Sequence, residues 1–586
     1  MSALKNGIYS VKTVFIYAPI LCVGYLLLML ISAIVSPFRI YLMERLVDSV
    51  SVSASATINF TLLLVITIIM ERSLYLANGT LITAIDSKLD KRQLPVTLDK
   101  FTWIEYSCFE DSDKQDMLQK ISENPQSNVL SVFNSLIAIT YSVVSTAGIL
   151  LMFFRSSWLL GTVSFITLLP MFLLESISAN KEMALRWNMT PDIRKRYYLQ
   201  QLFVDKDALQ EIKLFGAKQR LIDLSDGLTE KINSDMKKTL NKVILLSSAS
   251  SIFILAFTGF SLVYLSLALM GGAVTLGVFV SLITSTSSFY NNAKNTVGQT
   301  AQFIRLSHGV QYYRDFLSLT ERHNSIHNKA LDGKFFTIEF KDVSFRYPSS
   351  KELVLKDINL TINSDQRIAF VGENGAGKST MIKLILGLYK PVNGTILING
   401  VDNNDISDQD RRRIFSVIFQ DYQKYQLTLR ENAALGAVDK MQDDKSIRHA
   451  LALAGADSIA SGDLDINLGK IEDDGVELSG GQWQRLALAR AYMSDATFII
   501  MDEPTAALDP IAESEMYSQF AKALSHQAAI LISHRLASAK MVDKIYVLSN
   551  GVICESGTHD VLLERKGVYA DMWEKQSSWY KEECAI

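Results

Sequence analysis

Runs of apolar residues long enough to cross a bilayer recur through the first half of this 586-residue chain. A membrane-spanning helix needs about 20 predominantly apolar residues to cross about 30 Å of hydrocarbon, and each run is close to that length. The predicted spans are residues 14–36, 58–81, 130–154, 157–178, 243–269 and 274–297. The sequence therefore predicts an all-α transmembrane domain of six helices within residues 1–320.

The connections between the predicted spans alternate in length, which indicates how the chain is oriented. The two long connections follow the second and fourth spans and carry many lysines and arginines, whereas the short connections carry almost none. Basic loops stay on the cytoplasmic side. We therefore expect the long loops and both termini to be cytoplasmic. Residues 109–121 and 205–215 within these loops have apolar residues at helical spacing, so the helices should continue beyond the bilayer.

Polar residues inside the predicted spans allow two interpretations. One set lies on a single face of the last span, and it either lines a solute pathway or packs helices together. This set is Ser281, Ser285, Ser288, Asn292 and Asn295. Glu71 and Arg72 lie well inside the second span, where charge is costly and normally faces a cavity or a partner. Alternatively, these two lie beyond the hydrocarbon core or extend to its edge.

Residues 335–586 follow a different pattern, in which short apolar strands alternate with helix-like stretches. This alternation is typical of an α/β domain. The polar, non-periodic residues 321–334 form the predicted linker, so the chain is expected to be a multidomain membrane protein. A net charge of −3 gives no basic field for nucleic acid. Its four scattered cysteines suggest neither a metal site nor a disulfide framework.

A complete phosphate-binding loop opens the α/β domain. The apolar strand IAFVG is followed by the loop ENGAGKS and then by an amphipathic helix, which gives the GxxxxGK[ST] pattern. Glycines let backbone N–H groups approach phosphates, Lys378 is suited to the β- and γ-phosphates, and Ser379 is suited to Mg²⁺. The expected nucleotide-binding residues here are Gly372, Asn374, Gly375, Gly377, Lys378, Ser379 and Thr380.

Further residues suited to bind Mg²⁺, to activate a water or to contact phosphate lie at the ends of other apolar strands. The strand TFIIMD ends in Asp502, suited to Mg²⁺, and Glu503, suited to activate a water as general base. His534 ends the strand AAILIS and is suited to contact the γ-phosphate or orient the water. Gln420 follows the apolar run SVIF, where its amide could ligate Mg²⁺.

In their order, these motifs resemble the ATP-binding-cassette (ABC) transporters along essentially the whole chain. The resemblance rests on GENGAGKST, Gln420, LSGGQ, IIMDEP and His534. Six spans fused ahead of one cassette are similar to an exporter half-transporter of the type IV fold, in which two copies make the working unit. In that family, Tyr347 would stack on adenine and Asp509 would couple the two sites. Residues 109–116 and 204–209 would be the coupling helices.

The resemblance also gives a role to a second glycine-rich segment, ELSGGQWQR. Its residues Ser479, Gly480, Gly481 and Gln482, here called the signature segment, open a helix whose N–H groups can bind a γ-phosphate. They would clamp ATP held by the phosphate loop of the partner chain. The sequence departs from the family pattern at Ile471–Asp474, which puts coupling contacts between subunits in question, and at Ala506.

Together these features lead us to expect ATP-driven export by alternating access, with ATP and Mg²⁺ as cofactors and ATP hydrolysis as the reaction. Intact Glu503, His534 and signature segment favour a homodimer. The segments FQDYQKYQLTLREN and SGGQWQR are similar to exporters of lantibiotic-like peptides, so the expected cargo is a peptide or amphipathic small molecule. Alternatives are a lipid floppase and an ATP-regulated membrane protein that does not pump. The expected location is a bacterial inner membrane, among membrane lipids, with the nucleotide-binding domain in the cytoplasm and no nucleic-acid partner.

Overall fold

A computed structural model describes residues 2–111, 114–115, 117–118, 121, 125–321, 335–460, 462–503, 527–532 and 536–583. The chain divides into two compact units. The first comprises Met1–Thr102 and Asp116–Leu319, and the second comprises Trp103–Gln115 and Thr320–Ile586.

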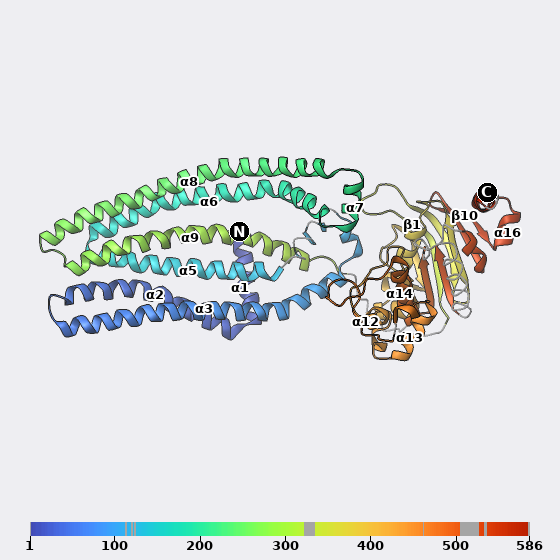
Figure 1. The fold of residues 1–586 in the computed structure, drawn as a ribbon, viewed down its shortest axis with the longest axis horizontal. Coiled ribbons are helices and arrows are strands. Elements are labelled where there is room, and N and C mark those ends of the chain that lie inside the picture. Colours follow the sequence, from blue (N-terminus) through green and yellow to red (C-terminus); the bar gives the residue numbers. More distant parts are fainter. Residues whose placement is uncertain are drawn as a thin grey trace. The chain divides into compact units, whose positions relative to one another are not determined.

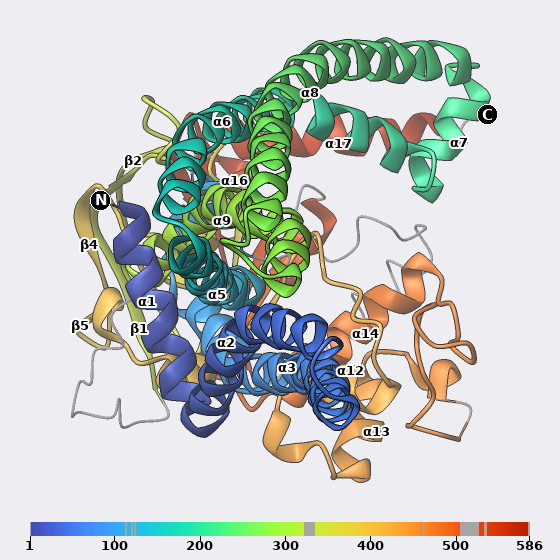
Figure 2. The ribbon, with the colours of Figure 1, turned by 90° about the vertical axis from the view of Figure 1, so that its left-hand side faces the viewer.

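The first unit is built from helices, most of them long (Figure 1). They are α1 (Ser2–Tyr17), α2 (Pro19–Ser49), α3 (Ala54–Trp103), α5 (Pro125–Ser156), α6 (Trp158–Leu202), α7 (Lys206–Leu214), α8 (Lys218–Met270) and α9 (Leu276–Leu317). Helix α5 packs along α9, α6 packs along α8, and α1 crosses α5 and α9. Figure 2 shows α6 and α8 curving together away from α2 and α3 toward the short helix α7.

Five of these helices are long and apolar enough, among the described residues, to cross a membrane: α2, α3, α5, α6 and α8. The sixth predicted span, residues 274–297, lies in α9 but is not among the five. The serine, threonine and asparagine residues of α9 dilute its apolar side chains. The first predicted span, residues 14–36, is broken at Ala18, between α1 and α2. Each of the predicted spans runs on as helix past its predicted C-terminal limit, as expected for the connections after the second and fourth spans.

Aromatic packing and a close contact between the first turn of α9 and α2 hold α9 against its neighbours. Phe153 of α5 meets Phe257 of α8 and Phe289 of α9 edge-on, with ring centroids 5.4 and 5.6 Å apart. At the start of α9, the Gly277 N–H donates to the Asp48 carboxylate over 2.7 Å. A Cβ at this glycine would lie 2.1 Å from a backbone oxygen of α2, so only glycine fits there.

The contacts of the polar residues in the predicted spans help to decide whether these residues pack helices together or line a solute pathway. Ser281 and Ser285 are buried, and their hydroxyls donate to carbonyls of their own helix, whereas Asn292 donates to Ser145 of α5. These contacts favour helix packing for that part of the stripe. Glu71 has a partner that the sequence did not indicate, since Arg39 of α2 donates to it over 2.9 Å.

The described residues of the second unit form two sheets (Figure 1). One is antiparallel, in the order β2 (Leu355–Asn363), β1 (Thr337–Phe345), β4 (Asn393–Ile398) and β5 (Val401–Asp402). The other has the order β10 (Val552–Gly557), β9 (Lys544–Ser549), β3 (Arg367–Gly372), β8 (Ala528–Ile532), β7 (Phe498–Asp502) and β6 (Phe415–Ile418), and all of it except β10 is parallel. Strands β7 and β8 are fully buried, as their continuous apolar sequences predict.

Helices complete the α/β unit. They are α10 (Lys378–Ile385), α11 (Asp408–Ile414), α12 (Leu429–Ala434), α13 (Asp444–Leu453), α14 (Gly480–Met493), α16 (His559–Glu564) and α17 (Val568–Glu583). Among them, α10, α11 and α14 contact strands of the parallel sheet, whereas α12 and α13 pack against α14. The predicted fold class, an all-α membrane domain fused to an α/β ATPase domain, is confirmed.

Both predicted cytoplasmic segments contain helix. Asp205 caps α7 by accepting from the N–H groups of Asp207 and Ala208, so the helix predicted at 205–215 is present. In the other segment, residues 109–121, the described residues 114–115, 117–118 and 121 are helical, and a short 3₁₀ helix, Tyr106–Phe109, ends at its first residue.

Candidate nucleotide site

The phosphate loop connects the end of β3 to the start of α10. Gly375 and Gly377 have φ angles of 81° and 102°, a backbone region that favours glycine. A Cβ at Gly377 would lie 2.6 Å from the Leu355 side chain. The loop therefore needs glycine both for its turn and for its close approach to β2, and it directs the start of α10 into the site.

Lys378 is held inside this loop. Its ammonium donates to the carbonyls of Gly372 and Glu373 over 2.9 and 2.8 Å, and the residue is only 5% exposed. Burial lowers the pKa of the ammonium, while the carboxylates of Glu503 and Asp502 act in the opposite direction. A cation fixed in this position is suited to bind phosphate oxygens.

A cavity of about 730 Å³ opens at the loop, a volume in the usual range for small-molecule sites. Its described lining residues are Tyr347, Val354, Asn374, Gly375, Gly377, Lys378, Ser379, Thr380, Gln420 and Glu503. All except Val354 are candidates from the sequence. Val354 is an apolar residue just before β2, and no sequence motif distinguishes it.

Two adjacent carboxylates lie at the end of β7, and their surroundings differ. Asp502 is buried and accepts a hydrogen bond from the Ser379 hydroxyl over 3.3 Å. Burial raises the pKa of Asp502 to about 6, although the Ser379 bond acts against it. Glu503 lines the cavity with a φ of 49°, which is strained for a residue with a side chain. Its N–H donates to the Ile532 carbonyl of β8, which helps hold that conformation.

The donor set around Ser379 fits Mg²⁺. A hydroxyl from Ser379 and a carboxylate from Asp502 lie together, and the Gln420 amide lines the same cavity. Oxygen ligands of this kind, together with phosphate oxygens, are what Mg²⁺ prefers.

Tyr347 lines the cavity beside the start of α10. Its hydroxyl is 3.0 Å from that of Thr380, and its ring meets the rings of Phe345 and Tyr389 edge-on at 5.1 and 5.4 Å. Lys383 lies 5.3 Å from its ring centroid. These contacts fix an aromatic ring beside the phosphate loop, where it can stack on a base.

Tyr389 is a residue that the sequence did not single out. Its hydroxyl donates to Glu110, its ring packs edge-on against Tyr106, and the adjacent Lys390 pairs with Glu105 over 3.3 Å. The expected coupling segment therefore contacts the aromatic cluster around Tyr347.

The signature segment begins α14 with a capping box. The Ser479 hydroxyl accepts from the Gln482 N–H, and the Gln482 side chain accepts from the Ser479 N–H over 2.8 Å. The N–H groups of Gly480 and Gly481 lie in the first turn, where a helix attracts anions.

The departure at Ile471–Asp474 lies in a turn that bonds to itself. The Gly469 N–H donates to the Val476 carbonyl, and the Val476 N–H donates to the Asn467 carbonyl. The Asn467 amide in turn donates to Asp474 over 3.0 Å. His534, Asp509 and Ala506 lie outside the described residues.

A phosphate loop, a paired serine and aspartate, and an adjacent glutamate on a parallel sheet define a P-loop nucleotide hydrolase, here fused to apolar membrane helices. The family described as "ABC transporter" matches residues 355–506. The subtilin transport ATP-binding protein SpaT of Bacillus subtilis is 30% identical over 475 residues, covering 80% of this chain and 77% of the relative. The nisin transport ATP-binding protein NisT of Lactococcus lactis subsp. lactis is 30% identical over 564 residues, covering 93% and 91%.

More distant similarity extends to other exporters. The ATP-dependent lipid A-core flippase of Escherichia coli (strain K12) is 26% identical over 481 residues, covering 80% of each chain. A solved structure of a bacterial Atm1-family ABC exporter with ATP bound shares the fold, with a TM-score of 0.80 at 21% identity. That match covers 95% of this chain and 98% of the other.

The chain belongs to the ABC transporters, as its motifs predict. It is an integral membrane protein that binds ATP and hydrolyses it to drive export.

Proposed function

We propose that this exporter moves a peptide out of a bacterial cell as a dimer of two identical chains that share two composite ATP sites. One observation carries the proposal. Of the described residues that line the cavity around Lys378, none comes from the signature segment of the same chain. A second chain is therefore needed to bring the N–H groups of Gly480 and Gly481 to the phosphates.

Within each site, the chain's own residues divide the work. Tyr347 stacks on the adenine, and the backbone of Gly372 to Thr380, with Asn374 and Lys378, holds the phosphates. Ser379, Gln420 and Asp502 would hold Mg²⁺, which neutralises charge on the phosphate oxygens when it is bound. Ser479 to Gln482 of the partner subunit close the site.

Hydrolysis requires an activated water. Glu503 is the proposed general base, since it lines the cavity next to Asp502 and its backbone is held by β8. His534 is proposed to orient the water and the γ-phosphate, and Asp509 is proposed to couple the two sites. Closure of the dimer on ATP is passed to the membrane helices through residues 109–116 and 204–209, and hydrolysis resets them.

In the proposed arrangement, residues 1–320 form a domain with six membrane-spanning helices, α9 being the sixth. Residues 321–334 are the linker, and residues 335–586 form the nucleotide-binding domain on the cytoplasmic side of the bacterial inner membrane. The small polar residues of α9 pack it against neighbouring helices of its own chain, as Asn292 does with Ser145 of α5, which explains its lower apolar content.

The names of SpaT and NisT support a peptide as cargo, because those relatives transport subtilin and nisin. The flippase supports a lipid, at lower identity. The test is the ATPase rate of the full chain in lipid discs, with nisin, subtilin or lipid A added at increasing concentration. We expect saturable stimulation by peptide only. Stimulation by lipid alone, accompanied by its transfer between leaflets, would identify a flippase and contradict the peptide assignment.

A further inference from the structure

We infer that Tyr422 is a positioning residue that couples the two ATP sites, because it joins a loop at one site to the helix start that serves the other. The inference rests on the composite-site dimer proposed above.

The loop in question links β6 to α12 and starts in the nucleotide cavity. Gln420 lines the cavity, and two residues later the Tyr422 hydroxyl donates to the Gly480 carbonyl over 2.9 Å. The ring of Tyr422 is half-buried against the apolar core beneath α14. A single side chain therefore connects the neighbourhood of the γ-phosphate site to the first residue of the signature helix.

Arg490 makes a second connection between the same loop and the same helix. From α14, its guanidinium donates to the Gln423 carbonyl over 2.9 Å and lies 4.8 Å from the ring centroid of Tyr425. It also donates to the Asn432 side chain over 3.2 Å. The middle of the loop is thus attached to α14 at two points, Gly480 and Arg490.

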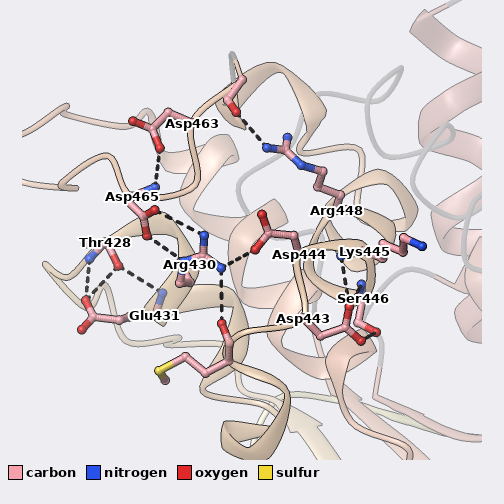
Figure 3. A network of polar contacts seen from close by, with 12 residues as sticks. Thr428, Arg430, Glu431, Asp443, Asp444, Lys445, Ser446, Arg448, Asp463 and Asp465 are labelled. Atoms are coloured by element: carbon pink, nitrogen blue, oxygen red, sulfur yellow. Dashed lines mark hydrogen bonds and ion pairs between the residues drawn. The ribbon is translucent and has the colours of Figure 1, made fainter.

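The far end of the loop is anchored independently. Thr428 caps α12 in a capping box with Glu431, and Arg430 donates to Asp444 and Asp465 over 2.5 and 2.6 Å (Figure 3). These bonds tie the start of α12 to α13 and to the segment before the signature. A displacement of Gln420 must therefore be taken up by residues 421–427, which are attached to α14.

The two ends of this connection, Gln420 and the start of α14, serve different ATP sites. Gln420 serves the phosphate loop of its own chain, whereas Gly480 and Gly481 serve ATP on the partner. When Gln420 moves on ligand binding, Tyr422 shifts the Gly480 carbonyl and with it the orientation of the adjacent N–H groups. Binding at one site thereby changes affinity at the other, and thermodynamic linkage makes this coupling reciprocal.

The test compares Tyr422→Phe with Tyr425→Phe in the full chain reconstituted in lipid discs. Each change removes one hydroxyl and keeps the ring, but only Tyr422 bonds to the signature helix through its hydroxyl. For wild type and Tyr425→Phe, we expect a Hill coefficient for ATP hydrolysis that approaches about 2, the number of sites, and for Tyr422→Phe a fall toward about 1. The melting temperature and the affinity for a fluorescent ATP analogue without Mg²⁺ should remain those of wild type.

Different results would overturn the role of Tyr422 and the composite-site dimer. A cooperative wild type with an equally cooperative Tyr422→Phe variant overturns the coupling role of Tyr422 and leaves the dimer intact. A wild type that hydrolyses ATP without cooperativity and stays monomeric with ATP overturns both. A fall in the Hill coefficient of Tyr425→Phe equal to that of Tyr422→Phe shows a general effect of the loop and also overturns the inference.

Discussion

The Ser379 hydroxyl donates to the Asp502 carboxylate over 3.3 Å, and this bond joins the first turn of α10 to the end of β7. The two residues are 123 positions apart in the sequence, and each ends a separate motif. Their proximity means that groups suited to phosphate, to Mg²⁺ and to an attacking water converge at one edge of the parallel sheet.

Lys378→Ala should weaken ATP binding by about 10- to 100-fold, because a charged hydrogen-bond donor to phosphate is lost. Equilibrium binding of a fluorescent ATP analogue measures this loss. Lys445→Ala is the matched control, since its ammonium is exposed at the start of α13. Equal affinity in the two variants would refute the assigned role of Lys378.

Glu503→Gln should bind ATP normally but turn it over about 100- to 10,000-fold more slowly, which is the usual contribution of a general base. The amide keeps the size of the side chain and cannot accept the proton. Phosphate release under saturating ATP measures the rate. A near-normal rate would exclude Glu503 as the base.

Tyr347→Ala should weaken binding of ATP by about 1–3 kcal/mol, the usual value of stacking between a base and an aromatic ring. Binding of tripolyphosphate, which lacks a base, should be unaffected. Tyr347→Phe keeps the ring while it loses the contact with Thr380, and it should retain most of the affinity. Equal losses for ATP and tripolyphosphate would contradict stacking.

Asp502 should make the stability of the nucleotide-free protein depend on pH. Its pKa of about 6 in the folded protein lies above the ordinary value of about 3.9, so folding favours the protonated carboxyl. The contribution of Asp502 to the stability of the folded protein is complete at pH values below the ordinary pKa of the carboxyl group. This contribution is lost as the pH rises through about 6, the pKa in the folded protein. Asp502→Asn should therefore raise the melting temperature in chelator at pH 8 and much less at pH 5.

The same substitution should remove the stabilisation that Mg²⁺ and ATP give together. We claim that the ionised carboxylate of buried Asp502 destabilises the nucleotide-free protein at pH 8. A melting temperature of Asp502→Asn below that of wild type at pH 8 in chelator would contradict this claim.

The nucleotide site could be predicted well because its residues lie in contiguous motifs. In GENGAGKST, spacing alone places glycines, lysine and serine around a helix start, and the cavity lining agrees. Val354, which lines the cavity, and Tyr389, which packs against Tyr347, could not be predicted, since packing between segments distant in sequence places them. Tyr389 meets Glu110 across 279 positions, and no local pattern specifies that contact.

In the membrane half, apolar runs located the helices but not the contacts between them. Glu71 was expected to face a cavity or a partner, yet its partner Arg39 lies in another helix and had no signal of its own. The extent of α9 was missed in part because its apolar run ends well before Leu317, where buried contacts rather than composition sustain the helix.

The most direct test of the composite site combines two inactive chains in one dimer. Lys378→Ala disables the phosphate loop, and Gly480→Asp places a negative charge at the signature segment, where a Cβ meets no described atom within 4 Å apart from its neighbours in α14. If each site uses the phosphate loop of one chain and the signature of the other, the mixed dimer has one intact site. Purified mixed dimers should then hydrolyse ATP although neither mutant homodimer does, whereas mixed dimers as inactive as both homodimers would contradict a shared site.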